Sequence, residues 1–204
     1  MQLIAENIGK SFGNYLIFKQ INMEVSSGQC IGIIGPNGSG KTTLIRVLSK
    51  LISPSTGRVS YKANGKELSR EEGFRYIGLI GPYLELYQDL TALENLQFFA
   101  KIRGLKNYQK KLEDLFEQFG LQNRQDDLVK TYSSGMKQRL KYIFALMHDP
   151  YILFIDEPRS NLDEEGIDTV YHVIKERKKD GIIFLATNEA DDLQFTDWTV
   201  NVNG

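Results

Sequence analysis

The stretch that decides the fold is Gly35-Pro36-Asn37-Gly38-Ser39-Gly40-Lys41-Thr42-Thr43. It matches the pattern G-x-x-x-x-G-K-[ST], directly after an apolar run at residues 31–34 and before a helical segment expected at about residues 41–49. In such a loop the backbone N–H groups can curl around a phosphate, and the helix N-terminus adds partial positive charge. Chance alone gives the bare pattern in roughly one chain of this length per hundred, and the flanking elements make a chance match far rarer. We therefore predict that these nine residues bind a nucleotide, with Lys41 on the β- and γ-phosphates and the Thr42 hydroxyl on Mg²⁺.

A second motif is an apolar strand, residues 151–155, that ends in the carboxylates Asp156 and Glu157. Because side chains alternate along a strand, these two carboxylates leave on opposite sides and cannot simply double as one metal ligand. We predict that Asp156 holds the magnesium shell and that Glu157 polarises the attacking water as a general base. The alternative is a pair of solvated charges at a strand end. The apolar strand that leads into the pair favours the first interpretation.

The bulk properties describe an ordinary globular chain of 204 residues with a net charge of -1, from 25 basic and 26 acidic side chains. That balance weakly disfavours a dedicated nucleic-acid binder. The one cysteine, Cys30, fits a reducing compartment and is expected to be a buried core thiol. The start of the chain does not resemble a signal peptide, and no run of about 18 apolar residues occurs. A role at a membrane would therefore need a partner that supplies the membrane.

Hydrophobic periodicity predicts an α/β fold with a helical insertion. The expected strands and helices are as follows: strands at 2–8, 15–25, 31–34, 59–61, 76–80, 151–155, 182–186 and 198–202, helical character from 91 to 148, and a helix at 163–179. A turn is expected at Gly13-Asn14. No internal repeat or low-complexity stretch interrupts this order.

The segment Tyr132-Ser133-Ser134-Gly135-Met136-Lys137-Gln138-Arg139 reads as a helix start, with Ser133 as its cap and an anion site at the N–H groups around Gly135. Placed between the phosphate loop and the acidic strand, it resembles the LSGGQ signature of the ATP-binding cassette (ABC) ATPases, in a variant often seen in exporters. The resemblance covers essentially the whole chain. It implies that Ser133 and Gly135 contact the γ-phosphate bound by a second subunit, in a head-to-tail dimer that holds two ATP molecules.

The same resemblance implies a RecA-like P-loop NTPase core with a small antiparallel β-subdomain and an inserted α-helical subdomain. We expect a single domain over residues 1–204. Its core and β-subdomain would occupy about 1–82 and 150–204, and its helical subdomain about 83–149. By the same resemblance, Phe12 stands where an aromatic ring stacks on adenine, although a core position is an alternative. Asp163 lies in the loop expected to cross to the partner subunit.

The chain departs from the family pattern at two places. Pro82 stands near the position where a glutamine contacts magnesium and senses the membrane partner, and Gln88 is too far downstream to be a simple replacement. Asn188 replaces a histidine after the strand at 182–186. It can donate a neutral hydrogen bond to a γ-phosphate but cannot carry a proton. We therefore expect hydrolysis that is slow or weakly coupled. His148 and His172 are expected to be structural or exposed.

The predicted function is an ATPase subunit that uses ATP and Mg²⁺ and powers transport through a separate integral membrane permease, on the cytoplasmic face of the cell membrane. The form of the signature and the short sequence after Asp197-Trp198 favour export. Tyr83, Leu84, Leu86 and Tyr87 lie where the permease would dock, or else belong to a packed loop. The alternatives are a catalytically weak regulatory cassette, a soluble cassette protein acting on ribosomes or DNA, and a P-loop kinase. A soluble cassette protein of that kind usually carries tandem cassettes or a long coiled-coil insertion, and this chain has neither. A P-loop kinase needs an acceptor-binding lid and has no use for the segment at residues 133–139.

Overall fold

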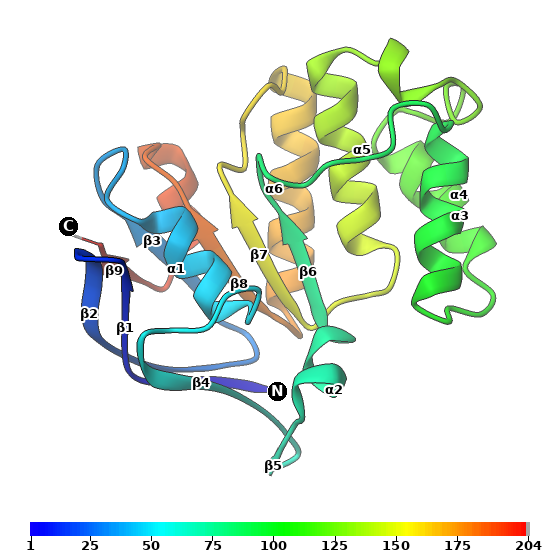
Figure 1. Cartoon of the computed structure of the whole chain (residues 1–204). Coiled ribbons are helices and arrows are strands. Elements are labelled where there is room, and N and C mark those ends of the chain that lie inside the picture. The colour runs from blue at the N-terminus through cyan, green and yellow to red at the C-terminus, as the bar shows by residue number, and fades with distance from the viewer. Residues whose placement is uncertain (203–204) are drawn as a thin grey trace.

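The computed structural model describes residues 1–202 and contains two β-sheets flanked by helices (Figure 1). One sheet has four antiparallel strands in the order β2-β1-β4-β5. The other has five parallel strands in the order β6-β7-β8-β3-β9. Helices lie on both faces of the parallel sheet, which is the arrangement that sequence periodicity predicts for an α/β core.

The antiparallel sheet begins with a hairpin of β1 (Gln2–Phe12) and β2 (Tyr15–Ser26). The predicted Gly13-Asn14 turn joins them, with Phe12 paired to Tyr15. β4 (Thr56–Ala63) pairs with the other edge of β1, and the short β5 (Lys66–Glu67) pairs with β4. β1 continues four residues beyond its predicted end at residue 8, because it stays paired with β2 as far as Phe12.

The parallel sheet consists of β3 (Cys30–Ile34), β6 (Ile77–Ile80), β7 (Ile152–Asp156), β8 (Ile182–Ala186) and β9 (Trp198–Asn201). Side chains alternate between two hydrophobic clusters. Phe154 and Phe184 pack on the side of α1 (Lys41–Leu48), and Ile155 and Leu185 pack on the side of α5 and α6. All residues of β7 and β8 are buried, as expected of central parallel strands. The carboxyl ends of these strands carry the polar residues of the predicted site.

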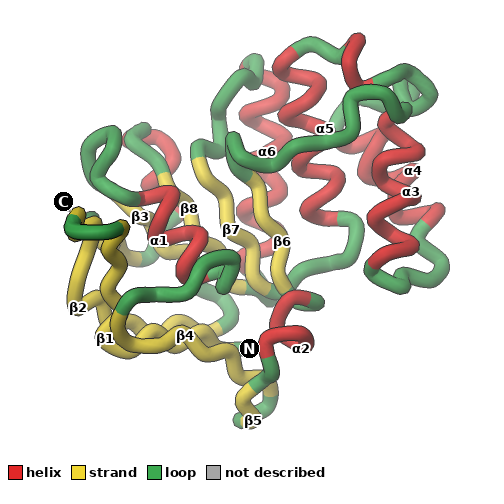
Figure 2. The backbone as a smooth tube through the Cα atoms, in the orientation of Figure 1, coloured by secondary structure: helices red, strands yellow, loops and turns green. Residues whose placement is uncertain are grey.

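The helical insertion contains α3 (Ala92–Ile102), α4 (Gln109–Gln118) and α5 (Ser134–Leu146), with a short 3-10 turn, η1 (Val129–Thr131), before α5. Figure 2 shows α3, α4 and α5 gathered on one side of the molecule, whereas α1 lies among the strands on the other side. The helical character predicted from 91 to 148 is confirmed, but turns and loops at 103–108 and 119–128 divide it into separate helices. α6 (Glu164–Lys178) and the 3-10 helix η2 (Ala190–Phe195) belong to the core.

The core contains the one cysteine of the chain. The predicted burial of Cys30 is confirmed, and burial raises the pKa of its thiol to about 12.

A short helix that sequence periodicity did not predict, α2 (Arg70–Phe74), begins with a capping box between Ser69 and Glu72. Across residues 1–202, none of the helices combines the length and the apolar content that a membrane crossing requires.

Candidate nucleotide site

The phosphate loop connects β3 to α1, so its predicted position between a strand and a helix is confirmed. Gly38 and Gly40 adopt the left-handed backbone, with φ of 81° and 106°, and Gly40 is the N-cap of α1. A Cβ atom on Gly40 would lie 2.3 Å from Cγ2 of Ile17 in β2. The loop therefore packs closely on the antiparallel sheet, and a side chain at Gly40 would push the two apart.

Lys41 is the first residue of α1 and is only 7% exposed. Its ammonium group donates hydrogen bonds to the carbonyl oxygens of Gly35 at 2.7 Å and Pro36 at 3.2 Å. The cation is therefore held inside the loop by two neutral acceptors. Phosphate oxygens carry full negative charge and are stronger acceptors for the same cation.

Thr42 and Asp156, the two predicted magnesium ligands, are in direct contact. The Thr42 hydroxyl donates to Oδ2 of Asp156 at 2.6 Å, which joins α1 to the end of β7. Asp156 is 2% exposed, and burial together with the Glu157 charge raises the pKa of its carboxyl group, against the opposing effects of Thr42, Lys41 and Arg46. A hydroxyl and a carboxylate side by side are the hard oxygen donors that Mg²⁺ prefers, so these two residues fit the cation.

Glu157 begins the turn after β7, where its backbone has φ of 58° and its N–H donates to the carbonyl oxygen of Ala186. Its side chain is exposed whereas that of Asp156 is buried, as the predicted separation of the pair requires. A cavity of about 440 Å³ is lined by Glu157, Asn37 and Asn188, among other residues. The predicted base and the residue that replaces the expected histidine therefore face the same space as the phosphate loop.

Asn188 follows β8 and donates a hydrogen bond from Nδ2 to Oδ1 of Asn37 at 2.5 Å. The preceding residue, Thr187, donates to the carboxylate of Asp192, which also accepts from the Tyr171 hydroxyl at 2.8 Å. Asp192 is fully buried. Sequence reasoning missed this carboxylate, which holds the loop that presents Asn188. An acidic residue shortly after a buried strand was the available signal, but periodicity does not reveal such burial.

The signature segment forms the N-terminus of α5, as predicted. The Ser133 hydroxyl accepts from the N–H of Met136 at 3.2 Å and so caps the helix. A Cβ atom on Gly135 would lie 2.9 Å from the carbonyl oxygen of Asn161, so this helix end packs against the loop that precedes α6. Asp163 caps α6 and accepts a hydrogen bond from Arg139 at 2.6 Å, which holds the pKa of its carboxyl group below the ordinary value.

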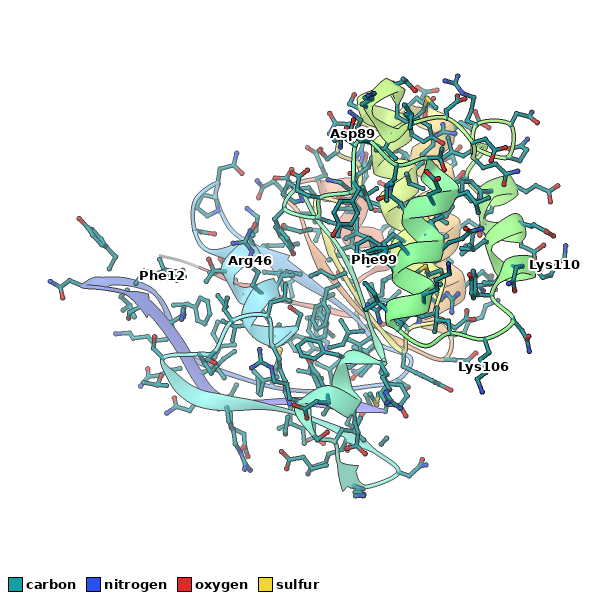
Figure 3. All side chains as sticks on the ribbon, turned by 45° about the vertical axis from the view of Figure 1, so that its right-hand side comes forward. Phe12, Arg46, Asp89, Phe99, Lys106 and Lys110 are labelled. Carbon is teal, nitrogen blue, oxygen red and sulfur yellow. The ribbon has the colours of Figure 1, made fainter. Side chains whose placement is uncertain are left out.

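The candidate residues therefore fall into two groups. Ser133, Gly135 and Asp163 gather at the neighbouring N-termini of α5 and α6, whereas the phosphate loop lies well apart on the other side of β7 (Figure 1). Phe12 lies near the tip of the β1–β2 hairpin (Figure 3) and is 51% exposed, so the alternative that it is a core residue is wrong. The Lys10 ammonium lies 4.8 Å from the centre of its ring.

The segment at residues 81–91 follows β6 and shows the departure from the family pattern. Pro82 is exposed, and Gln88 donates its side-chain N–H to the carbonyl oxygen of Leu86 in the same segment. The segment was predicted to be either a docking surface or a packed loop, and its residues include both exposed and buried positions. Leu86 is buried in the core, whereas Tyr87 is 52% exposed and packs on Phe98 and Phe99.

Comparisons with known proteins agree with this geometry. A family model described as ABC transporter matches residues 18–160. The "Uncharacterized ABC transporter ATP-binding protein YdbJ" of Bacillus subtilis is 40% identical over 174 residues, which are 85% of this chain and 56% of that protein. The "Linearmycin resistance ATP-binding protein LnrL" of Bacillus subtilis is 34% identical over 91% of this chain and 60% of its own length.

This chain thus spans less than two thirds of each of these two relatives. A solved structure described as "Structure of ATP binding subunit of ABC transporter" aligns with 100% of this chain and 86% of its own, with a TM-score of 0.90 and 28% identity. The two sheets, the inserted helices and the phosphate loop are therefore those of an ABC ATPase. The chain belongs to the ABC transporter family, among its ATP-binding proteins.

Proposed function

We propose that this chain binds and hydrolyses Mg²⁺-ATP and powers export through a separate membrane permease, as one half of a head-to-tail dimer. The observation that carries the proposal is the contact between Thr42 and Asp156. It brings the phosphate loop, a hard-oxygen metal site and the exposed carboxylate of Glu157 together at one edge of the parallel sheet. Ligands of α/β proteins bind at this carboxyl edge.

The residues divide the chemistry among them. Lys41 and the backbone N–H groups of residues 37–43 bind the β- and γ-phosphates, while Thr42 and Asp156 hold the cation. Magnesium, when bound, compensates the negative charge on the phosphate oxygens. Glu157 accepts the proton of the attacking water as that water's oxygen bonds to the γ-phosphorus and the bond to the bridging β–γ oxygen breaks. Asn188 donates a neutral hydrogen bond to the γ-phosphate from Nδ2.

The second group of residues requires a second cassette subunit, identical or related. The α5 N-terminus offers backbone N–H groups beside Ser133 and Gly135, which suit an anion. Because that end lies apart from the phosphate loop of its own chain, it would complete the site of the other subunit. Asp163 lies at the same end. Phe12 would stack on adenine, since its ring is exposed near the tip of the hairpin.

Two further parts of the proposal concern the partner and the domain. The exposed rings of Tyr87 and Phe98 suit a permease segment docked beside the 81–91 segment, which would hold the chain at the cytoplasmic face of the membrane. The name of LnrL, a linearmycin resistance protein, supports export over import. We also propose that residues 1–204 form one ABC ATPase domain, with the helical subdomain at about 83–149.

A second candidate is a catalytically weak, regulatory cassette. Two observations favour it: Pro82 offers no side-chain donor or acceptor, and Asn188 is already bonded to Asn37. Turnover separates the two functions, because a regulatory cassette binds ATP but hydrolyses it at the background rate.

The test is size-exclusion chromatography of the purified chain with Mg²⁺-ATP, comparing Glu157→Gln with the wild type. Removing the general base should stop hydrolysis and trap a dimer that elutes earlier than the wild type. Glu113→Gln, an exposed neutralisation on α4, is the matched control and should elute as the wild type does. A Glu157→Gln protein that stays monomeric at saturating ATP would contradict the dimer.

A further inference from the structure

Tyr83 carries an unexplained polar group close to the candidate nucleotide site. Its ring folds back on Gly81, where a Cβ atom would lie 2.7 Å from Cζ of the tyrosine. The Arg46 guanidinium, from α1, covers the ring at 4.2 Å. The Tyr83 hydroxyl is buried, and although the Arg46 guanidinium can donate to its oxygen, the hydroxyl itself donates to no acceptor within residues 1–202. Burying a donor that has no acceptor destabilises a protein, so native structures rarely contain one without a role.

The contact with Arg46 places the Tyr83 ring beside α1, one helical turn after Thr42. Burial raises the pKa of Tyr83, the negative charge of Asp156 raises it further, and Arg46 opposes both. The hydroxyl is therefore protonated at neutral pH and can donate a hydrogen bond. Asp156 already accepts from Thr42 at Oδ2, and no hydrogen bond to its Oδ1 occurs in the part of the chain that the structure describes. The Tyr83 hydroxyl, which donates no hydrogen bond, and the incompletely paired Asp156 carboxylate therefore belong to the same region.

We propose that Tyr83 is a positioning residue of this site, whose hydroxyl donates a hydrogen bond into the oxygen shell that Thr42 and Asp156 form for magnesium. The inference rests on the proposed function, because it assumes that Mg²⁺-ATP binds between these residues. In this proposal the Tyr83 hydroxyl reaches the metal shell from the segment in which the family pattern would place a glutamine. It therefore supplies a polar contact that Pro82 cannot make.

The segment at residues 81–91 also connects Tyr83 to the helical insertion, through contacts with α3. Four residues after Tyr83, the backbone N–H of Tyr87 donates to Oδ1 of Asn95 at 2.8 Å, and Nδ2 of Asn95 donates to the Tyr87 carbonyl oxygen at 2.9 Å. Asn95 is fully buried in α3, and the Tyr87 ring packs on Phe99. Figure 3 labels Arg46 on α1, which contacts the Tyr83 ring, and Phe99 on α3, which contacts the Tyr87 ring. A hydrogen bond formed by Tyr83 would stiffen the segment between these two anchors.

The test uses Tyr83→Phe, which keeps the ring and removes only the hydroxyl. Tyr151→Phe, with an exposed ring just before β7 and outside the 81–91 segment, is the matched control. For each purified chain, ATP affinity is measured by calorimetry with Mg²⁺ and with EDTA, and amide exchange of residues 81–91 is measured in both states. Circular dichroism melting checks that both variants fold.

We expect Tyr83→Phe to keep the wild-type affinity for metal-free ATP and to reduce the affinity gained from Mg²⁺ by about fivefold to tenfold, the effect of one hydrogen bond. The protection of residues 81–91 on adding Mg²⁺-ATP should also decrease in Tyr83→Phe and persist in Tyr151→Phe. Equal magnesium gains and equal protection in Tyr83→Phe and the wild type would overturn the proposal while leaving the ATPase intact. A wild-type chain that fails to bind Mg²⁺-ATP would instead overturn the proposed function and this inference with it.

Discussion

The two groups of candidate nucleotide contacts differ in how their side chains are engaged. At the phosphate loop, Lys41 and Asp156 are buried and bonded to neighbours that a nucleotide and its cation can replace. At the α5 end, Ser133 and Asp163 cap their own helices, and Arg139 is engaged by Asp163. The first group offers a buried cation and oxygen donors that suit a metal, whereas the second offers chiefly helix N-termini. In the proposed dimer, one chain would therefore carry two halves of different sites rather than one complete site.

The largest effect should follow from Lys41→Ala at the phosphate loop. Loss of the buried ammonium removes the charge-assisted hydrogen bonds to the β- and γ-phosphates, and we expect the Kd for ATP to rise by roughly a hundredfold or more. Calorimetry on the purified chain measures it. Lys137→Ala, at the α5 end, should leave the Kd unchanged. If both variants bind ATP equally, the proposed difference between the two groups is wrong.

The converse change is Gly135→Ala at the α5 end. The added methyl group would meet the Asn161 carbonyl oxygen and displace the helix start, so hydrolysis per chain should fall by roughly a hundredfold while ATP affinity stays near the wild-type value. Steady-state phosphate release and calorimetry, on the same preparation, separate the two. Gly104→Ala, at an exposed turn of the helical insertion with open space around it and φ of 66°, strains the backbone away from both groups and so controls for a general loss of stability on replacing glycine. Loss of binding in Gly135→Ala would mean that both groups serve one nucleotide.

The contrast between these groups also explains what sequence reasoning could reach. The phosphate loop, the acidic strand and the Ser133 cap were predictable because each depends on residues close together in the chain. The bond between Asn188 and Asn37 joins residues 151 positions apart, and periodicity contains no information about it. The buried carboxylate of Asp192 and the folded-back ring of Tyr83 lie in irregular segments. There, position depends on tertiary contacts rather than on a repeating pattern.

A smaller effect concerns the contact between the residues just after α5 and strand β6 of the parallel sheet. Nε2 of His148, just after α5, lies 2.8 Å from the Ile77 carbonyl oxygen, while its Nδ1 is buried and has no hydrogen-bond partner within residues 1–202. Burial and the nearby Arg103 lower the pKa of His148 to about 4 from 6.5. Since the folded state disfavours protonation, its contribution to stability is complete above pH 6.5 and is lost as the pH falls toward 4.

Between pH 7.5 and pH 5 this loss should amount to roughly 2 kcal/mol in the free energy of unfolding. Urea denaturation at both pH values measures it, with His148→Gln as the variant that cannot titrate. His172→Gln, at an exposed position on α6, is the matched control and should retain the wild-type pH dependence. An equal pH dependence in His148→Gln and the wild type would exclude this histidine as the cause.

The smallest expected effect is that of Asn188→Ala, at the phosphate loop's own edge. Asn188 donates one neutral hydrogen bond, so its loss should reduce turnover by about fivefold to tenfold and leave ATP affinity nearly unchanged. Asn188→His restores the residue expected in the family and should increase turnover if this position limits the rate. Ordinary cassette turnover in the wild type, unchanged in Asn188→Ala, would exclude that limit. Turnover would then depend on Lys41, Thr42, Asp156 and Glu157. The slow step would be association with the N-terminus of α5 in another subunit.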